Sequence, residues 1–222
     1  EDTYNVQVTI SIADSNELFY SKLRSGTTAY DLIIPSDYMI EKMVLKGLVQ
    51  EIDYAKLPNF QTGNTRYLQG LETIMENMDP ITENYYVPYF WGTFGLMYNK
   101  RVPGLKESLE LHQWDAYFDP SIRPASARTG MYDTPQYAFA AAMLYLGEDP
   151  NDPSDLNIAR AQQVLKQGGF SVWADDQLKK SIAANNLDLA FVWTGDFLDM
   201  LFIDLDEGKT YDEISYDIVV PD

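Results

Sequence analysis

The chain has 222 residues, of which 45% are apolar, and its 34 acidic against 16 basic residues give a formal net charge of −18. This length allows one large or two small domains with a real core, while the acidic balance argues against nucleic acid, whose binding requires basic patches, and favours cationic small molecules. The absence of cysteine excludes disulfides, thiol catalysis and cysteine-ligated zinc, and no apolar run reaches the ~18 residues of a membrane span.

Hydrophobic periodicity predicts strands alternating with helices in the first half of the chain. The expected strands are 6–10 and a buried 32–34, and the expected helices follow a cap at Asp14 or Ser15, cover 40–48 and cover 71–78. Residues 84–99 break this rhythm, because aromatic residues dominate there around Pro88. We interpret that segment as a crossover between two lobes near 93–96.

The same alternation resumes in the second half. Strands are expected at 129–132, 172–174, 189–193 and 218–220, and helices at 134–147, 153–167, 176–184 and from 197 onward. The first of these helices has Thr134 as a cap and Pro135 in its first turn, which is a common helix start. This order predicts a parallel sheet flanked by helices.

Two predicted strand ends have the same layout of an aromatic residue, a hydroxyl residue and an acid. In open α/β sheets, ligands bind at the carboxyl ends of strands. Trp193 can present its ring face to a cation, and Asp196, three residues later, can accept hydrogen bonds from an ammonium group. The structural alternative is a core tryptophan followed by an acid that favours the helix start.

The earlier strand end offers Ser36, Asp37 and Tyr38, which suit polar recognition of a small ligand. Alternatively, Ser36 or Asp37 caps the next helix and Tyr38 packs against it. Both interpretations can hold together, because capping and ligand contact do not exclude each other.

Three further residues are candidates for ligand contact. Tyr89 and Trp91 flank the crossover and could line a pocket, although such aromatic runs also form a core or a hinge. Asp133 follows a predicted strand, where it could contact a cation or favour the helix start.

Catalytic and cofactor chemistry has weak support. Neighbouring acids such as Asp175 and Asp176 are usually solvated, His112 has no second histidine beside it, and glycine-rich phosphate loops are absent. We therefore expect no catalytic residue, no metal ligand and no cofactor. A hydrolase with paired carboxylates stays open as an alternative, because the separation of its acids is not visible in a sequence.

Several segments together resemble the spermidine/putrescine-binding proteins, the solute receptors of bacterial polyamine ABC importers. The similar segments are YDLIIPSDYMIEKMVLKGLVQEIDYAKLPNF, YYVPYFWGTFGLMYN, HQWDAYFDPSI, GMYDTPQYAFAAAMLYLG, LDLAFVWTGDF and YDIVVP. The resemblance implies a type II periplasmic-binding-protein-like α/β fold with two lobes, each with a mixed sheet flanked by helices. Residues 1–94 would form part of the N-terminal lobe and 95–222 most of the C-terminal lobe. Segments of the family are missing at both termini, so we expect a truncated piece.

Carried over by position, the resemblance makes Ser36 and Tyr38 first-lobe ligand contacts, Trp193 an aromatic wall and Asp196 an acid that receives an amine. The pattern departs at two positions, where spermidine-type members have an Asp and a Glu and this chain has Thr134 and Tyr137. Putrescine, another diamine or another cation therefore remain open as ligands.

The expected function is that of a solute-binding component of an ABC importer, which binds putrescine or spermidine between its lobes and is not an enzyme. Its partner would be a membrane permease, and it would lie outside the cytoplasm, in the periplasm or anchored at the cell surface as a lipoprotein. The alternative in the same class is another small cation, a metal complex or an anion as the ligand.

Overall fold

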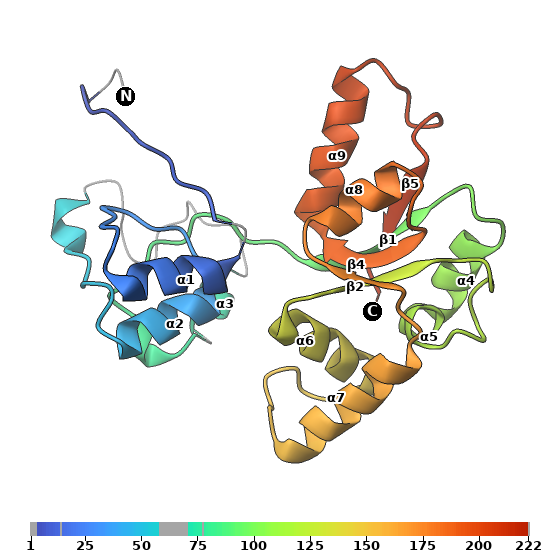
Figure 1. Ribbon diagram of the computed structural model, residues 1–222, viewed down its shortest axis with the longest axis horizontal. Helices are drawn as coiled ribbons and strands as arrows, with labels where there is room; N and C mark the ends of the chain where they lie inside the picture. The colour runs from blue at the N-terminus through green and yellow to red at the C-terminus, as the bar shows by residue number, and fades with distance from the viewer. Residues whose placement is uncertain (1–3, 14, 58–70, 77, 222) are drawn as a thin grey trace. The chain divides into compact units, whose positions relative to one another are not determined.

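The computed structural model describes residues 4–13, 15–57, 71–76 and 78–221. The chain divides into two compact units, Glu1–Trp91 and Gly92–Asp222, and both are drawn in Figure 1. In the part of the chain that is described, no helix is both long and apolar enough to cross a bilayer.

The first unit is built from short helices. They are α1 (Asn16–Ser25), α2 (Asp37–Leu45), α3 (Leu71–Glu76) and the 3₁₀ turns η1 (Tyr54–Lys56) and η2 (Pro80–Thr82). Ser15 caps α1 by accepting a hydrogen bond from the backbone N–H of Leu18, as the sequence predicts. Tyr20, Met39 and Met43 form the centre of a small buried cluster where α1 and α2 pack together.

The two strands predicted in this unit, at 6–10 and 32–34, are wrong. Neither segment is in a strand, and their apolar side chains are exposed: Ile10 is 81% and Leu32 is 79% accessible. Alternation and an apolar run describe which face of a strand would be buried, but a strand also needs a neighbour with which to exchange backbone hydrogen bonds. All strands among the described residues belong to the second unit, so the described part of the first unit offers these segments no neighbouring strand.

The second unit contains one mixed sheet of five strands. These are β1 (Phe94–Asn99), β2 (Thr129–Tyr132), β3 (Val172–Ala174), β4 (Leu189–Trp193) and β5 (Tyr216–Val219), in the order β3-β2-β4-β1-β5. Strand β2 pairs in parallel with β3 and β4, whereas β1 is antiparallel to both β4 and β5. The parallel arrangement favoured by the β-α order therefore holds for β2, β3 and β4, and the antiparallel β1 and β5 make this sheet mixed, as the family resemblance implies.

Helices cover both faces of this sheet. They are α4 (Leu105–His112), α5 (Trp114–Phe118), α6 (Pro135–Leu146), α7 (Asp155–Gln167), α8 (Gln177–Ala183) and α9 (Thr194–Asp206). Figure 1 shows α8 and α9 on one face, with α6 and α7 on the opposite side. Two predicted helix ends are confirmed: Ser154 accepts a hydrogen bond from the N–H of Asn157, and Gly147 ends α6 in the left-handed conformation with φ of 67°. Thr134 stands at the predicted N-cap of α6, but its side chain makes no cap hydrogen bond.

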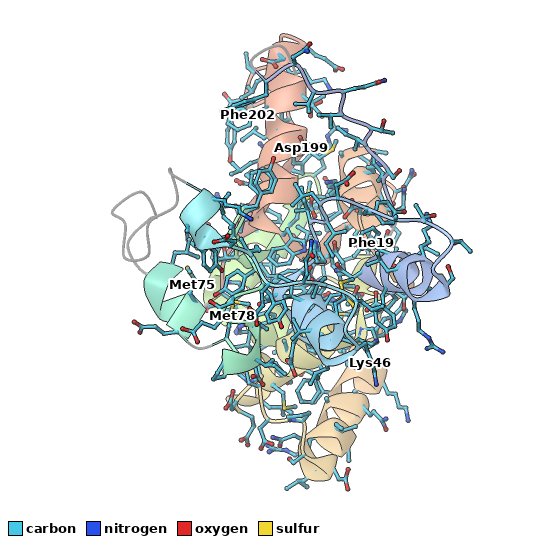
Figure 2. The ribbon with its side chains drawn as sticks, turned by 90° about the vertical axis from the view of Figure 1, so that its left-hand side faces the viewer. Phe19, Lys46, Met75, Met78, Asp199 and Phe202 are labelled. Atoms are coloured by element: carbon cyan, nitrogen blue, oxygen red, sulfur yellow. The ribbon has the colours of Figure 1, made fainter. Side chains whose placement is uncertain are left out.

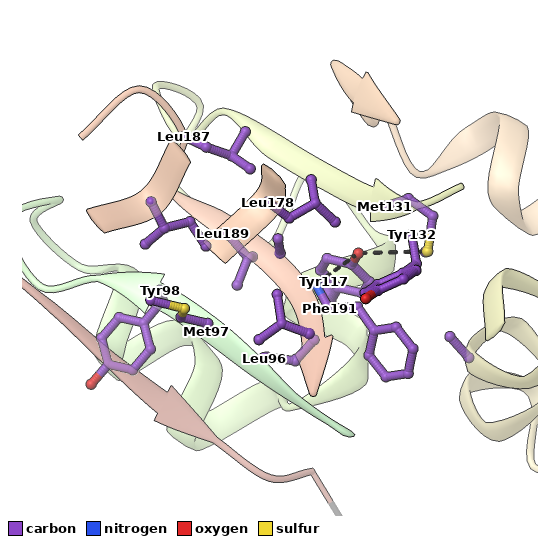
Figure 3. Packing of buried hydrophobic residues seen from close by; sticks show 14 of the residues in the cluster. Leu96, Met97, Tyr98, Tyr117, Met131, Tyr132, Leu178, Leu187, Leu189 and Phe191 are labelled. Atoms are coloured by element: carbon purple, nitrogen blue, oxygen red, sulfur yellow. Dashed lines mark hydrogen bonds between the residues drawn. The ribbon is translucent and has the colours of Figure 1, made fainter. Parts of the chain in front are cut away.

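A buried tyrosine from α5 separates two parallel strands near their carboxyl ends. The Tyr117 hydroxyl donates to the carbonyl of Gly130 in β2 at 2.5 Å and accepts from the N–H of Phe191 in β4 at 3.2 Å. Figure 3 shows this side chain in the core between β2 and β4. The parallel pairing of these strands ends at Gly130 and Ala190, so Tyr117 replaces the next step of backbone pairing.

Candidate functional site

Aromatic side chains gather where β2 and β4 end and β1 begins. We call this set the aromatic cluster; it consists of Phe94, Tyr132, Tyr137, Phe191 and Trp193. The ring centroids of Phe94 and Trp193 are 3.8 Å apart, and those of Phe94 and Phe191 are 4.3 Å apart. Tyr137 meets Trp193 edge to face at 5.5 Å. The antiparallel register, which sets Phe94 opposite Trp193, explains why these rings meet.

Asp196 follows Trp193 by three residues and pairs with a lysine of another helix. Asp196 is in the first turn of α9, where the helix dipole favours a negative charge. Lys179 of α8 places its Nζ 2.5 Å from Oδ1 of Asp196, and the two side chains are only 10% and 16% exposed. The other carboxylate oxygen, Oδ2 of Asp196, is buried and has no hydrogen-bond partner among the described residues. A buried acceptor without a partner is costly, so this oxygen is suited to a donor from outside the chain.

The surroundings shift the titration of both partners. Burial raises the pKa of Asp196 above its usual value, although the hydrogen bond from Lys179 and the charge of that lysine act against this. Burial acts to lower the pKa of Lys179, but the hydrogen bond to Asp196 and the charges of Asp196, Asp176 and Asp199 outweigh it and raise the pKa. Lys179 therefore stays protonated at neutral pH.

Two more acids border the pair. Asp176, just before α8, accepts a hydrogen bond from the Tyr132 hydroxyl at 3.2 Å. Burial and the negative charges of Asp176 and Asp196 raise the pKa of Tyr132, so its hydroxyl remains a donor. Asp199 lies one helical turn after Asp196, with its Oδ2 3.8 Å from Nζ of Lys179 and its side chain 65% exposed, and Figure 2 labels it on α9.

This arrangement can bind a positively charged organic group. Ring faces attract cations through their quadrupole, and carboxylates accept charge-assisted hydrogen bonds from ammonium groups. No trio of acidic or histidine side chains among the described residues is arranged to hold a metal ion. The site in the second unit is therefore suited to an amine.

The predicted residues of the first unit lie together at the start of α2. The Ser36 hydroxyl accepts a hydrogen bond from the Asn16 side-chain amide at 2.9 Å, and the Tyr38 hydroxyl donates to Glu17 at 3.1 Å. Asp37 is exposed and accepts from the N–H of Tyr38 at 2.8 Å. Ser36 stands at the N-cap of α2 but makes no side-chain cap bond, so its hydroxyl joins α2 to α1 instead.

The remaining predicted residues have open surroundings. Asp133 directly follows β2 and is exposed, while its backbone N–H donates to the carbonyl of Ala174 at 2.9 Å. Tyr89 and Trp91 belong to the first unit and are 66% and 50% exposed. The Tyr89 ring packs against that of Phe90, with centroids 4.2 Å apart.

The sequence interpretation missed Lys179 and Phe94, and assigned Asp176 only to a solvated turn. Lys179 follows Leu178 in a segment whose pattern indicates an ordinary amphipathic helix. No local spacing connects this lysine with Asp196, which lies 17 positions later. Only the packing of α8 against α9 brings them together. Phe94 could have been found from the strand register, had the antiparallel pairing of β1 with β4 been predicted.

Comparison with known proteins identifies the family. The family model for bacterial extracellular solute-binding proteins matches residues 1–221. The chain is similar to the putrescine-binding periplasmic protein SpuD of Pseudomonas aeruginosa, with 28% identity over 197 residues, 86% of this chain and 52% of that protein. It is also similar to the putrescine-binding periplasmic protein PotF of Escherichia coli, with 28% identity over 203 residues, 88% of this chain and 54% of that protein. The chain thus spans about half the length of the curated relatives it matches.

A solved structure of a similar protein has the same fold as this chain. The Tp0655 (TpPotD) lipoprotein of Treponema pallidum superimposes with a TM-score of 0.72 at 26% identity, over 99% of this chain and 64% of that one. The predicted type II periplasmic-binding-protein-like fold and the resemblance to spermidine/putrescine-binding proteins are confirmed. The chain belongs to the bacterial extracellular solute-binding proteins.

Proposed function

We propose that the protein is the solute-binding component of an ABC importer and that it binds a polyamine, with putrescine as the first candidate. The observation that carries this proposal is Asp196 at the start of α9, three residues after Trp193 of the aromatic cluster. Its buried Oδ2 has no hydrogen-bond partner in the part of the chain that the structure describes. The similarity to two putrescine-binding periplasmic proteins supports the same ligand class.

The chemistry of a diamine fits these groups. An ammonium group loses strong hydration when it binds, and a carboxylate can replace that hydration while ring faces cover the methylenes. A desolvated cation–π contact contributes about 2 kcal/mol and a hydrogen bond to a charged group about 1.5–3 kcal/mol. Several such contacts together can outweigh the cost of ordering the ligand and the protein around it.

The proposal includes a role, a partner and a location. The relatives are solute-binding proteins, several of them named as periplasmic, which supports a binding rather than a catalytic role. We assign residues 1–94 to one lobe and residues 95–222 to the other, with a crossover near 93–96. The boundary between the two compact units, which follows Trp91, supports this assignment. The partner would be a membrane permease, and the place of action would be outside the cytoplasm.

The ligand set would also include contacts from the first unit. The resemblance assigns Ser36 and Tyr38 to this role, and their hydroxyls already lie at one helix start, held by Asn16 and Glu17. Asp37, Asp133, Tyr89 and Trp91 complete the predicted contacts; the exposed side chain of Asp133 and the exposed rings of Tyr89 and Trp91 are accessible to a ligand.

One observation favours a second candidate within the same class. At the position where spermidine-type members have an acid, Tyr137 contributes a ring to the aromatic cluster, 5.0 Å from Phe94. A phenol in place of a carboxylate removes one negative partner for a second or third amine. The site would then bind a smaller cation with fewer charges than spermidine.

Calorimetric titration of the full-length gene product with putrescine, spermidine and the monoamine butylamine tests these proposals. We expect putrescine to bind and Asp196→Asn to weaken it by at least tenfold, because the amide carries no charge for the ammonium. Asp206→Asn is the matched control, since it removes the same charge from an exposed side chain at the other end of the same helix. Absence of heat with all three amines, while another class of solute binds, would contradict the polyamine proposal.

A further inference from the structure

The amine-binding acid of the second unit already has an ammonium partner from the same chain. Lys179 lies on α8 beside Leu178, which is fully buried, and is itself only 8% exposed. Its Nζ contacts Oδ1 of Asp196 at 2.5 Å and lies 3.8 Å from Oδ2 of Asp199. Such a contact holds the Asp196 carboxylate in one orientation.

This geometry divides the two oxygens of one carboxylate. Oδ1 of Asp196 is occupied by Lys179, and Oδ2 is buried without a partner among the described residues. A ligand ammonium that reaches Oδ2 gains a strong hydrogen bond, but it comes within a few ångströms of the ammonium of Lys179. Because both side chains are largely shielded from solvent, water and salt screen this repulsion poorly.

The surrounding charges determine how strongly the site attracts a ligand cation despite the repulsion from Lys179. Three carboxylates, those of Asp176, Asp196 and Asp199, act on Lys179. The lysine cancels one of these negative charges inside the site, so a cation meets less attraction than the acids alone would provide. A ligand with two charges is affected more than a ligand with one.

We propose that Lys179 is a specificity-determining residue, whose fixed ammonium orients Asp196 for a single amine and lowers the affinity of the site for dications. This inference rests on the proposed function, because it concerns the ligand of the same site. With Lys179 present, the site should prefer diamines over monoamines less strongly than it would with Asp196 alone.

The test compares three variants of the full-length gene product by calorimetric titration with putrescine and butylamine. Lys179→Gln removes the charge and keeps a donor for Asp196, and Lys179→Arg keeps the charge. Lys180→Gln is the matched control, since it makes the same charge change on an exposed neighbouring position of α8. We expect Lys179→Gln to bind both amines more tightly, putrescine by about tenfold and butylamine by a smaller factor, because putrescine carries a second charge that Lys179 repels. Lys179→Arg and Lys180→Gln should stay within about threefold of the unsubstituted protein with both amines.

Thermal unfolding of each variant accompanies the titrations. If Lys179→Gln does not fold, Lys179→Met, which preserves the apolar stem, replaces it. If the unsubstituted protein binds putrescine and the folded, uncharged variant binds it equally or more weakly, the proposed role of Lys179 is overturned. The proposed function then still stands. Failure of every variant and of the unsubstituted protein to bind either amine would overturn the proposed function and this inference with it.

Discussion

Replacing Tyr117 by phenylalanine should destabilise the second unit far more than the loss of one hydroxyl group suggests. This hydroxyl donates to Gly130 in β2 and accepts from Phe191 in β4, and Tyr117 is fully buried. Phenylalanine fills nearly the same volume, so no large cavity forms. The substitution leaves a buried carbonyl and a buried N–H without a partner.

The magnitude follows from those two groups. Each buried polar group that loses its partner costs about 1–3 kcal/mol, so for two groups we expect a loss of about 2–6 kcal/mol in the free energy of unfolding. Domains of ordinary stability have about 5–15 kcal/mol, so this single change would remove a large share. The same strands carry Tyr132 and Trp193 at their ends, and a local opening there would also loosen the aromatic cluster.

Urea unfolding followed by circular dichroism measures this loss. Tyr98→Phe is the control, because Tyr98 is 1% exposed and its hydroxyl makes no hydrogen bond to any residue that the structure describes. We expect the control to lose less than about 1 kcal/mol, in keeping with an ordinary unpaired hydroxyl. A loss for Tyr117→Phe as small as that of the control would refute the argument that Tyr117 replaces backbone pairing between β2 and β4.

Three further changes have defined outcomes. Gly130→Ala should cost about 1–3 kcal/mol in urea unfolding, because its Cβ would lie 2.6 Å from a methyl carbon of Leu178; an unchanged midpoint would contradict this. Burial acts to raise the pKa of Asp188, but the hydrogen bonds that Arg128 donates to it and the positive charge of Arg128 lower this pKa in the folded state. Its contribution to stability is therefore present above the unfolded pKa of about 3.9 and is lost as the pH falls through the lower folded value. Arg128→Ala should move the midpoint of acid unfolding to higher pH, and an unmoved midpoint would show that the pair does not matter. Trp193→Ala should weaken putrescine binding by roughly 30-fold in calorimetric titration, as the loss of a cation–π contact of about 2 kcal/mol requires; a change below threefold would remove the indole from the ligand set.

Signals that act within a few residues were sufficient for the helices of the second unit. The capping hydroxyl of Ser154 and the left-handed Gly147 mark helix ends through the backbone groups of their own neighbourhood. For the same reason the turn after β4, with Trp193 and Asp196 at its start, could be located from the sequence. Local chemistry decides these features, so a local pattern predicts them.

Pairing between distant segments was beyond the same patterns. The alternation at 6–10 is consistent with a strand, yet a strand forms only where another strand completes its hydrogen bonds, and the described residues of the first unit offer none. The β-α order also did not give the direction of β1 and β5, because an antiparallel and a parallel buried strand have similar apolar runs; only the family resemblance implied a mixed sheet. Lys179 belongs to the same class of error, since its partner is set by helix packing.

The location of Lys179 also decides where selectivity should be sought in this acidic protein. The net charge of −18 attracts any cation from a distance, but exposed charges are screened over about 8 Å at physiological salt and act on an amine only through its total charge. The pair of Lys179 and Asp196 is largely shielded from solvent, so its field is screened less and acts at the position of a single ligand group. Salt should therefore slow the association of putrescine more than that of butylamine, while the change in affinity that Lys179→Gln produces, which depends on the buried pair, should change little with salt.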